Sequence, residues 1–131
     1  SNQAGGFSAG KPWLPVPPAH LPLAASMQDG NDGSMLEHYR KALAFRKRHP
    51  ALRTGAQTPI LAAGDVIEFL RIGGGEQVFV AANLGEGTAR AVLPPGEGRW
   101  RIGGRGLGVD ATDGATEVTL GPWELCLMVK E

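Results

Sequence analysis

The carboxylates of this 131-residue chain are the first side chains to consider for chemistry, because paired acids can act as general acid and base across a cleft. Beyond residue 53 the acids fall in predicted turns or on exposed strand positions, and none is part of a recognisable catalytic motif. They are Asp65, Glu68, Glu76, Glu86, Glu97, Asp110, Asp113 and Glu117. The sequence therefore predicts no catalytic residue in this chain.

Metal and cofactor sites are equally poorly supported by residue spacing. His20, His38 and His49 lie far apart and do not match a metal-binding spacing, so we expect structural roles for them. The single cysteine, Cys126, excludes an internal disulfide and fits a buried small apolar side chain in a reducing compartment. The run 103-GGRGLG-108 is no phosphate-binding motif and is expected to form a hairpin loop. We expect neither a metal nor a cofactor.

Charge and hydropathy exclude two classes of partner. Thirteen Lys and Arg residues balance thirteen Asp and Glu residues, which leaves no net positive field for nucleic acid. No apolar run approaches the length of a membrane-spanning helix, and the first residues lack the pattern of a signal peptide. We expect no nucleic acid, no membrane and a cytoplasmic location.

One amphipathic helix is clearly delimited. Ser34 is the expected N-cap, Glu37 completes a capping box, and Pro50 ends the helix. An apolar stripe is formed by Met35, Leu36, Tyr39, Ala42 and Leu43. Arg46 falls on this stripe, either as a packed stem with a paired head group or as an anion or substrate contact.

The residues before this helix are expected to contain no helix or strand. Five prolines fall within residues 1–33, and proline restricts the backbone to extended or turning conformations. Trp13 lies among them, in a loop too apolar for a solvated linker. Such a loop usually lies across another surface. The chain therefore offers the helical stripe no evident partner.

After residue 53 the pattern becomes that of short strands separated by Gly and Pro turns. The segments are 65–72, 76–83, 87–93, 99–102, 116–120 and 124–130, with a weaker one at 58–63. This pattern predicts a mainly β fold, an antiparallel β-sandwich or barrel. In the last strand Leu125, Leu127 and Val129 alternate with Cys126 and Met128. Both faces are apolar, so we expect one to meet the sandwich core and the other a covering surface.

Three stretches resemble the carboxy-terminal end of α-glucosidases and their relatives in the α-amylase superfamily, glycoside hydrolase family 13. They are 6-GFSAGKPWLPV-16, 34-SMLEHYRKALAFRKRHPALRTG-55 and 119-TLGPWELCLMV-129. Oligo-1,6-glucosidases and trehalose synthases share the pattern. The resemblance implies that residues 1–52 are the last loop and helix of a (β/α)8 catalytic barrel and that residues 53–131 form the β-sandwich C domain.

The resemblance also implies functional roles. The family's catalytic acids lie upstream of residue 1, so no catalytic position transfers to this chain. The family's loop that matches residues 6–16 lies near the pocket entrance, which makes Phe7, Lys11 and Trp13 candidates for shaping substrate access, although Trp13 could instead anchor the loop on the barrel. The structural candidates are Ser34, Glu37, Tyr39, Arg46 and Pro50. The expected partners are the remainder of the barrel, or another copy of this chain, and the oligosaccharide substrate of a bacterial parent enzyme.

Three hypotheses follow for the chain. The first is the structural C-terminal portion of a retaining α-glucoside-processing enzyme, hydrolase or transglycosylase. The second is a carbohydrate-binding β-sandwich module with Trp100 and Trp123 as aromatic candidates. The third is self-association through residues 1–52, driven by the exposed stripe.

Overall fold

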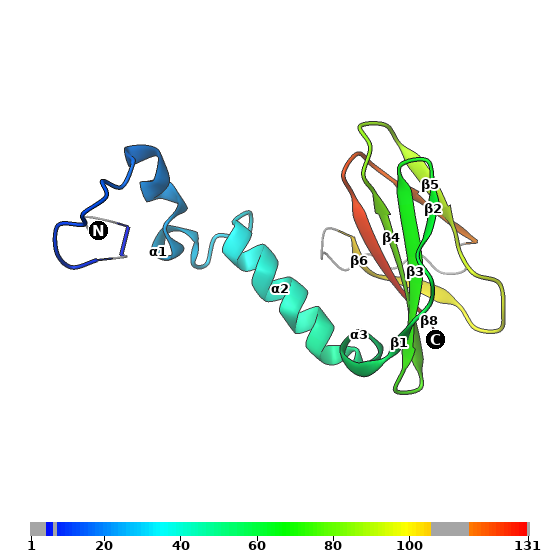
Figure 1. Ribbon diagram of the computed structural model, residues 1–131. Coiled ribbons are helices and arrows are strands. Elements are labelled where there is room, and N and C mark those ends of the chain that lie inside the picture. The colour runs from blue at the N-terminus through cyan, green and yellow to red at the C-terminus, as the bar shows by residue number, and fades with distance from the viewer. Residues whose placement is uncertain (1–4, 7, 106–115, 131) are drawn as a thin grey trace. The chain divides into compact units, whose positions relative to one another are not determined.

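The chain forms two compact units, residues 1–43 and residues 44–131. Our computed structural model describes residues 5–6, 8–105 and 116–130 (Figure 1). The first unit is helical and the second is built on β-sheets. Within the described residues, no helix combines the length and the apolar character needed to cross a membrane.

The first unit contains helices where the sequence led us to expect none. A 3-10 helix, η1, spans Pro18–Leu23, and a short helix, α1, spans Ala25–Gln28. The expectation was wrong because Pro18 occupies the first helical position. The backbone N–H at that position has no acceptor within a helix, so proline loses no hydrogen bond there. A 3-10 helix of six residues contains few internal hydrogen bonds, and for this reason it tolerates Pro22.

The predicted amphipathic helix is α2, Met35–Arg48, which runs from the first unit into the second. Pro50 does end it, but the same proline opens the next helix, α3, Pro50–Thr54. His49 lies between the two helices in an extended conformation, with φ −108° and ψ 102°. Proline fits the first position of α3 for the same reason as in η1.

The second unit holds two antiparallel sheets, which confirms the predicted mainly β class. The larger sheet has the order β1-β3-β4-β8-β6, with β2 also paired to β3. Its strands are β1 Ala56–Gln57, β2 Leu61–Ala63, β3 Val66–Gly73, β4 Glu76–Asn83, β6 Trp100–Arg105 and β8 Leu125–Lys130. The smaller sheet pairs β5 Ala89–Val92 with β7 Glu117–Leu120.

Most strands agree with the predicted segments to within one or two residues at each end, and two segments differ further. The weak segment at 58–63 is β2 alone, and the two-residue β1 precedes it. The expected loop at 103–108 begins later than predicted, because residues 103–105 belong to β6 and pair with β8 through a bulge. Residues 106–108 lie outside the described part of the chain. Glycine tolerates a bulge in a strand, which explains why a Gly-Gly pair does not end β6.

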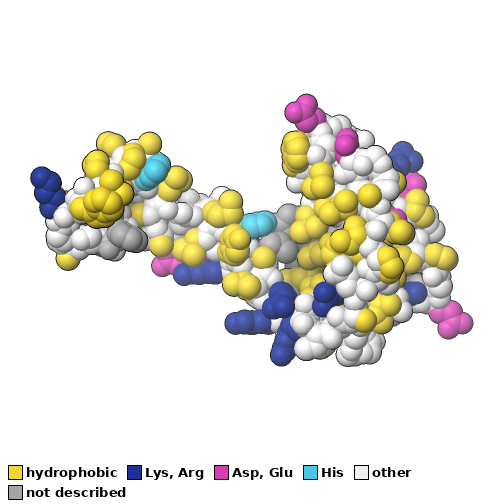
Figure 2. All heavy atoms as spheres, in the orientation of Figure 1, with side chains coloured by type: hydrophobic (Ala, Val, Ile, Leu, Met, Phe, Trp, Pro, Cys, Tyr) yellow, Lys and Arg dark blue, Asp and Glu magenta, His cyan; other side chains and the backbone are white. Residues whose placement is uncertain are grey.

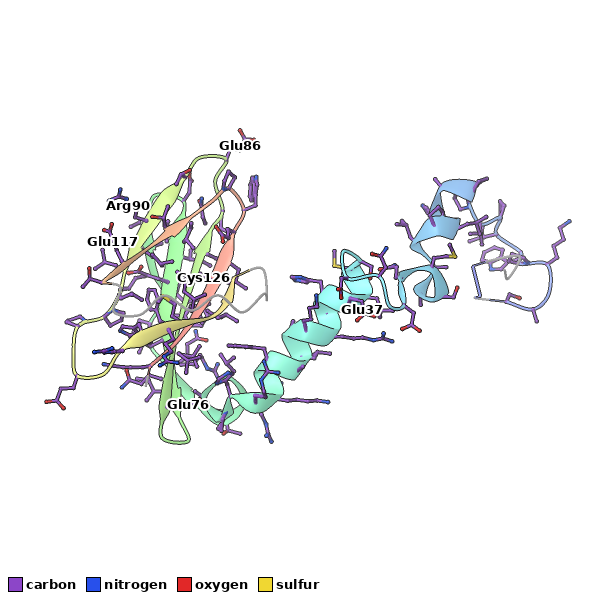
Figure 3. The ribbon with its side chains drawn as sticks, turned by 180° about the vertical axis from the view of Figure 1, so that it is seen from behind. Glu37, Glu76, Glu86, Arg90, Glu117 and Cys126 are labelled. Atoms are coloured by element: carbon purple, nitrogen blue, oxygen red, sulfur yellow. The ribbon has the colours of Figure 1, made fainter. Side chains whose placement is uncertain are left out.

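The main core lies between the two sheets. Its fully or nearly fully buried side chains are Val66, Phe79, Ala81, Ala91, Leu93, Trp100, Ile102, Val118, Leu120, Cys126 and Met128. Cys126 has no exposed surface, in agreement with its predicted apolar role, and Figure 3 shows it within the sandwich. The alternation along β8 places Cys126 and Met128 on this inner face.

Candidate functional site

The outer face of the larger sheet carries a second apolar cluster, which we call the junction. Val78, Val80, Leu127 and the partly buried Phe69 and Val129 come from the sheet. Phe45 from the last turn of α2, and Ala51 and Leu52 from α3, cover them. Phe45 is 4% exposed and Ala51 is fully buried. The expected covering surface for the second face of β8 is therefore supplied, in part, by the chain itself.

Phe45 lies away from the predicted stripe of α2. At 100° per residue it projects roughly 120° from the centre of the stripe formed by Met35, Tyr39 and Leu43. Those three side chains are 65%, 62% and 52% exposed. The helix thus has two apolar sides, of which the one at Phe45 is buried by this chain's own sheet.

Glu76 fixes the beginning of α3. Its Oε1 accepts the Ala51 N–H at 2.9 Å, and its Oε2 lies 3.0 Å from His49 Nδ1. No side chain caps the start of α3 from the usual N-cap position, so the carboxylate takes an amide that the helix cannot satisfy internally. Glu76 and His49 are each 19% exposed at the side chain. Figure 3 shows Glu76 at the end of the sheet, beside α3.

Arg71 binds two backbone carbonyls of the α3 segment. Its Nε donates to the carbonyl of Ala51 at 3.2 Å and its guanidinium NH2 group donates to the carbonyl of Gly55 at 2.8 Å. Gly55 is the C-cap of α3, so its carbonyl has no partner within the helix, whereas the Ala51 carbonyl also accepts the Gly55 N–H at 3.1 Å and gains a second donor from the guanidinium. Charged side chains from the sheet thus secure both ends of α3.

Close backbone contact brings α3 onto the hairpin between β3 and β4. A Cβ at Gly73 would lie 2.6 Å from Gly55 Cα, and a Cβ at Gly55 would lie 2.5 Å from the Ala51 carbonyl oxygen. The same Cβ at Gly55 would lie 2.7 Å from the carbonyl oxygen of Ile72 in β3, and all three distances are far below van der Waals contact. Glycine is required at these positions because the helix and the hairpin meet backbone to backbone.

The start of α2 forms a separate polar cluster within the first unit. The Glu37 N–H donates to Ser34 Oγ at 3.3 Å, as an N-cap would require. The second bond of the predicted capping box is absent: Glu37 Oε1 instead accepts the Gly30 N–H and an Arg40 N–H. Arg40 also donates to Asp29 Oδ1, and the hydrogen bonds to Asp29 and then to Glu37 raise the pKa of Arg40 above its ordinary value.

The remaining predicted residues are dispersed. Lys11 and Trp13 are exposed, Trp13 by 91%, while Phe7 lies outside the described residues. Arg46 is exposed and, within the described part of the chain, makes no ion pair. The structure does not bring these side chains together into one site.

The two tryptophans proposed for sugar binding differ in accessibility. Trp100 is 5% exposed, donates Nε1–H to the Pro94 carbonyl at 3.1 Å and packs edge-on against Phe79. Because its ring belongs to the core, it cannot stack on a sugar, and that part of the hypothesis was wrong. Trp123 is 68% exposed.

In the described residues, one ion pair joins an acid to a histidine, that between Glu76 and His49. Glu76 was expected in a turn or at an exposed strand position, but its side chain is only 19% exposed, beside the start of α3. The described residues contain no group of three side chains suited to hold a metal ion. Among the described residues, no carboxylate lines either of two surface hollows, one beside η1 and one beside Pro94–Gly96.

Sequence reasoning missed Phe45, Glu76 and Arg71 as organising residues. The available signal was the run of three glycines, Gly73 to Gly75, before Glu76, which marks a tight hairpin that can approach another backbone. Nothing in the sequence indicated that the approaching backbone would be a five-residue helix begun by Pro50.

Comparisons with known proteins agree with this architecture. A family model described as "Domain of unknown function (DUF3459)" matches residues 54–127. A probable α-glucosidase of Rhizobium meliloti (strain 1021) is 43% identical over 90 residues, 69% of this chain and 16% of that protein. The trehalose-6-phosphate hydrolase of Bacillus subtilis (strain 168) is 28% identical over 130 residues, 95% of this chain and 23% of that protein.

Solved structures also match this chain to part of a longer protein. The trehalulose synthase MutB of Pseudomonas mesoacidophila MX-45 matches 98% of this chain with a TM-score of 0.78 and 28% identity, over 23% of its own length. The chain thus spans about a quarter or less of the relatives that it matches. It belongs to the DUF3459 family, the carboxy-terminal domain of enzymes of the α-amylase superfamily.

Glu76→Ala should lower the free energy of unfolding by about 2 kcal/mol, because it leaves the Ala51 N–H of α3 without an acceptor. Urea denaturation measures the change. Glu117→Ala is the matched control, since Glu117 pairs with Arg90 in an ion pair whose side chains are 50% and 69% exposed (Figure 3). That control should cost at most about 0.5 kcal/mol. Equal losses in the two variants would contradict the role given to Glu76.

Gly73→Ala should destabilise the chain by about 2 kcal/mol, because the new Cβ would overlap the backbone at Gly55. Gly87→Ala is the control, since nothing lies within 4 Å of a Cβ at that position. Thermal unfolding followed by circular dichroism compares the two variants. A Gly73 variant as stable as the Gly87 variant would show that α3 does not meet the hairpin so closely.

Proposed function

We propose that this chain is the C-terminal portion of a retaining α-glucosidase-type glycoside hydrolase that acts on α-glucosidic bonds of small oligosaccharides. The observation that carries the proposal is that relatives named α-glucosidase, oligo-1,6-glucosidase and trehalose-6-phosphate hydrolase match this chain over only 14–23% of their own lengths. Most of each such protein lies outside the matched part. The catalytic residues of the parent enzyme are then supplied by that larger portion.

In this proposal the chain has a structural role. Residues 1–52 are the last loop and helix of the catalytic barrel, and residues 53–131 are the C domain that supports it. The junction favours this role, because Phe45, Ala51 and Leu52 bind the end of the helical segment to the sheet. The rest of the barrel covers the stripe at Met35 and Tyr39 and supplies a partner for Arg46.

The loop residues have a more specific proposed role. Phe7, Lys11 and Trp13 shape the entrance to the substrate pocket of the parent enzyme, as the family resemblance implies. The 91% exposure of Trp13 supports a contact outside this chain. Ser34, Glu37 and Pro50 set the ends of α2, and the parent is a cytoplasmic bacterial enzyme.

A transglycosylase is the second candidate for the parent. The structural match to trehalulose synthase, at 28% identity over 98% of this chain, favours it. Hydrolysis and transfer share a covalent glucosyl–enzyme intermediate and differ in whether water or a sugar attacks it. Product analysis of the parent with sucrose and maltose separates the two.

The proposed activity requires a longer protein, encoded by the complete reading frame, of which this chain is the C-terminal portion. The longer protein should hydrolyse an aryl α-glucoside or transfer its glucosyl group, whereas the purified 131-residue chain should release no aryl alcohol above the uncatalysed rate. A chromogenic assay follows both. Turnover by the 131-residue chain would refute the structural role, and a longer protein inactive on every α-glucoside would refute the parent activity.

In the absence of a barrel, we expect residues 1–52 to mediate self-association. Met35, Tyr39 and Leu43 are all more than half exposed, and an apolar stripe of this kind favours contact with another copy. Sedimentation velocity over a hundredfold concentration range should show a reversible dimer or higher species. Leu43→Glu should shift the chain toward monomer, while Val92→Glu on β5, an equally drastic change at an exposed site, should not. A monomer at all concentrations would contradict this expectation.

A further inference from the structure

Trp123 occupies a backbone position that suits glycine rather than tryptophan. It is the third residue of a turn from Gly121 to Glu124, closed by the Glu124 N–H donating to the Gly121 carbonyl at 3.3 Å. With Pro122 before it and φ of 55°, the turn follows the type II pattern. A bulky side chain in this left-handed region is strained, and such strain concentrates where a residue has a function.

A buried polar network holds this turn in place. Asn83, only 1% exposed, donates through Nδ2 to the carbonyls of Gly87 and Gly121, and its Oδ1 accepts the Gly85 N–H. The Trp123 N–H itself donates to the Gly85 carbonyl at 3.2 Å. Because Asn83 bonds to both the Gly85–Gly87 loop and the Gly121 turn, the backbone at Trp123 is held in position before any partner binds.

The surroundings of Trp123 are apolar with a charged rim. Leu84 is 51% exposed and precedes the glycine that bonds to Trp123, and Leu125, two residues beyond Trp123, is 43% exposed. The carbonyl of the exposed Asp65 accepts the Leu84 N–H, and the exposed Glu86, two residues beyond Leu84, lies at the tip of its loop (Figure 3). Figure 2 shows hydrophobic side chains gathered over the β-sheet unit.

We propose that Trp123, Leu84 and Leu125 form a second docking surface for the catalytic barrel of the parent enzyme, with Trp123 as its anchor; this inference rests on the proposed function. Leu125 lies on the same face of β8 as Leu127 and Val129, which pack against Phe45, Ala51 and Leu52 in the junction. The surface therefore continues a face that already binds barrel-type elements. An apolar centre, an aromatic anchor and a charged rim are the usual anatomy of a protein interface.

A sugar is the less suitable occupant. Stacking on an indole leaves the hydroxyls of a glucose ring pointing outward, and the leucine side chains beside Trp123 offer them no hydrogen-bond partner, so only the rim carboxylates of Asp65 and Glu86 remain as side-chain acceptors. The amide of Asn83 is already engaged in three internal hydrogen bonds, and Glu124 Oε2 accepts the Gly121 N–H. A protein surface, in contrast, gains from covering all three apolar side chains.

Trp123→Gly tests the proposal because it should change stability in opposite directions in the two proteins. In the 131-residue chain glycine relieves the strain and no partner is lost, so the thermal midpoint should rise by about 4 °C. In the longer protein the anchor is lost, so the first unfolding transition should fall by about 4 °C or more. Val92→Ala is the control, since Val92 is also 68% exposed but lies on β5, and its small effect should be the same in both proteins.

A rise in both proteins, or a fall in both, would overturn the docking surface. Either outcome leaves the proposed function to be judged by the α-glucosidase activity of the longer protein, so the two failures are distinguishable. Indole fluorescence of the 131-residue chain, titrated with maltotriose, tests the sugar. A saturable change that Trp123→Gly abolishes would also overturn the proposal, in favour of a carbohydrate site.

Discussion

Strands β4 and β8 bury apolar side chains on both of their faces, and the rest of the second unit depends on that constraint. Phe79 and Met128 belong to the core between the sheets, while Val80 and Leu127 belong to the junction. A sheet with two apolar faces needs two covers. The small β5–β7 sheet supplies one, and the segment from Phe45 to Leu52 supplies part of the other.

The second cover is a short helix, and short helices are unstable alone. Five residues form too few hydrogen bonds to offset the entropy of nucleation. Burial of Ala51 and bonds from Glu76 and Arg71 at the two ends of α3 replace the missing internal stabilisation. The sheet therefore does not merely rest against this helix; its charged side chains determine where the helix begins and ends.

Much of this architecture could be predicted from alternation and turn residues. The pattern of Cys126 and Met128 against Leu127 and Val129 indicated two covered faces, and both covers exist. Ser34 and Pro50 located the ends of α2. The helices before Met35 could not be predicted, because η1 takes Pro18 at its first position and Pro22 within a short 3-10 helix, and the four residues of α1 are too few for a helical pattern.

The candidate site was less predictable because it arises from contacts between residues distant in sequence. Glu76 reads as an exposed strand acid, and only the fold brings it to an amide 25 positions earlier in the chain. Trp123 reads as an ordinary turn residue until its φ and exposure are known together. The strained backbone at Trp123 lowers the stability of this chain, and the exposed indole gains little contact within it. The contact that compensates for the strain must therefore be sought outside this chain.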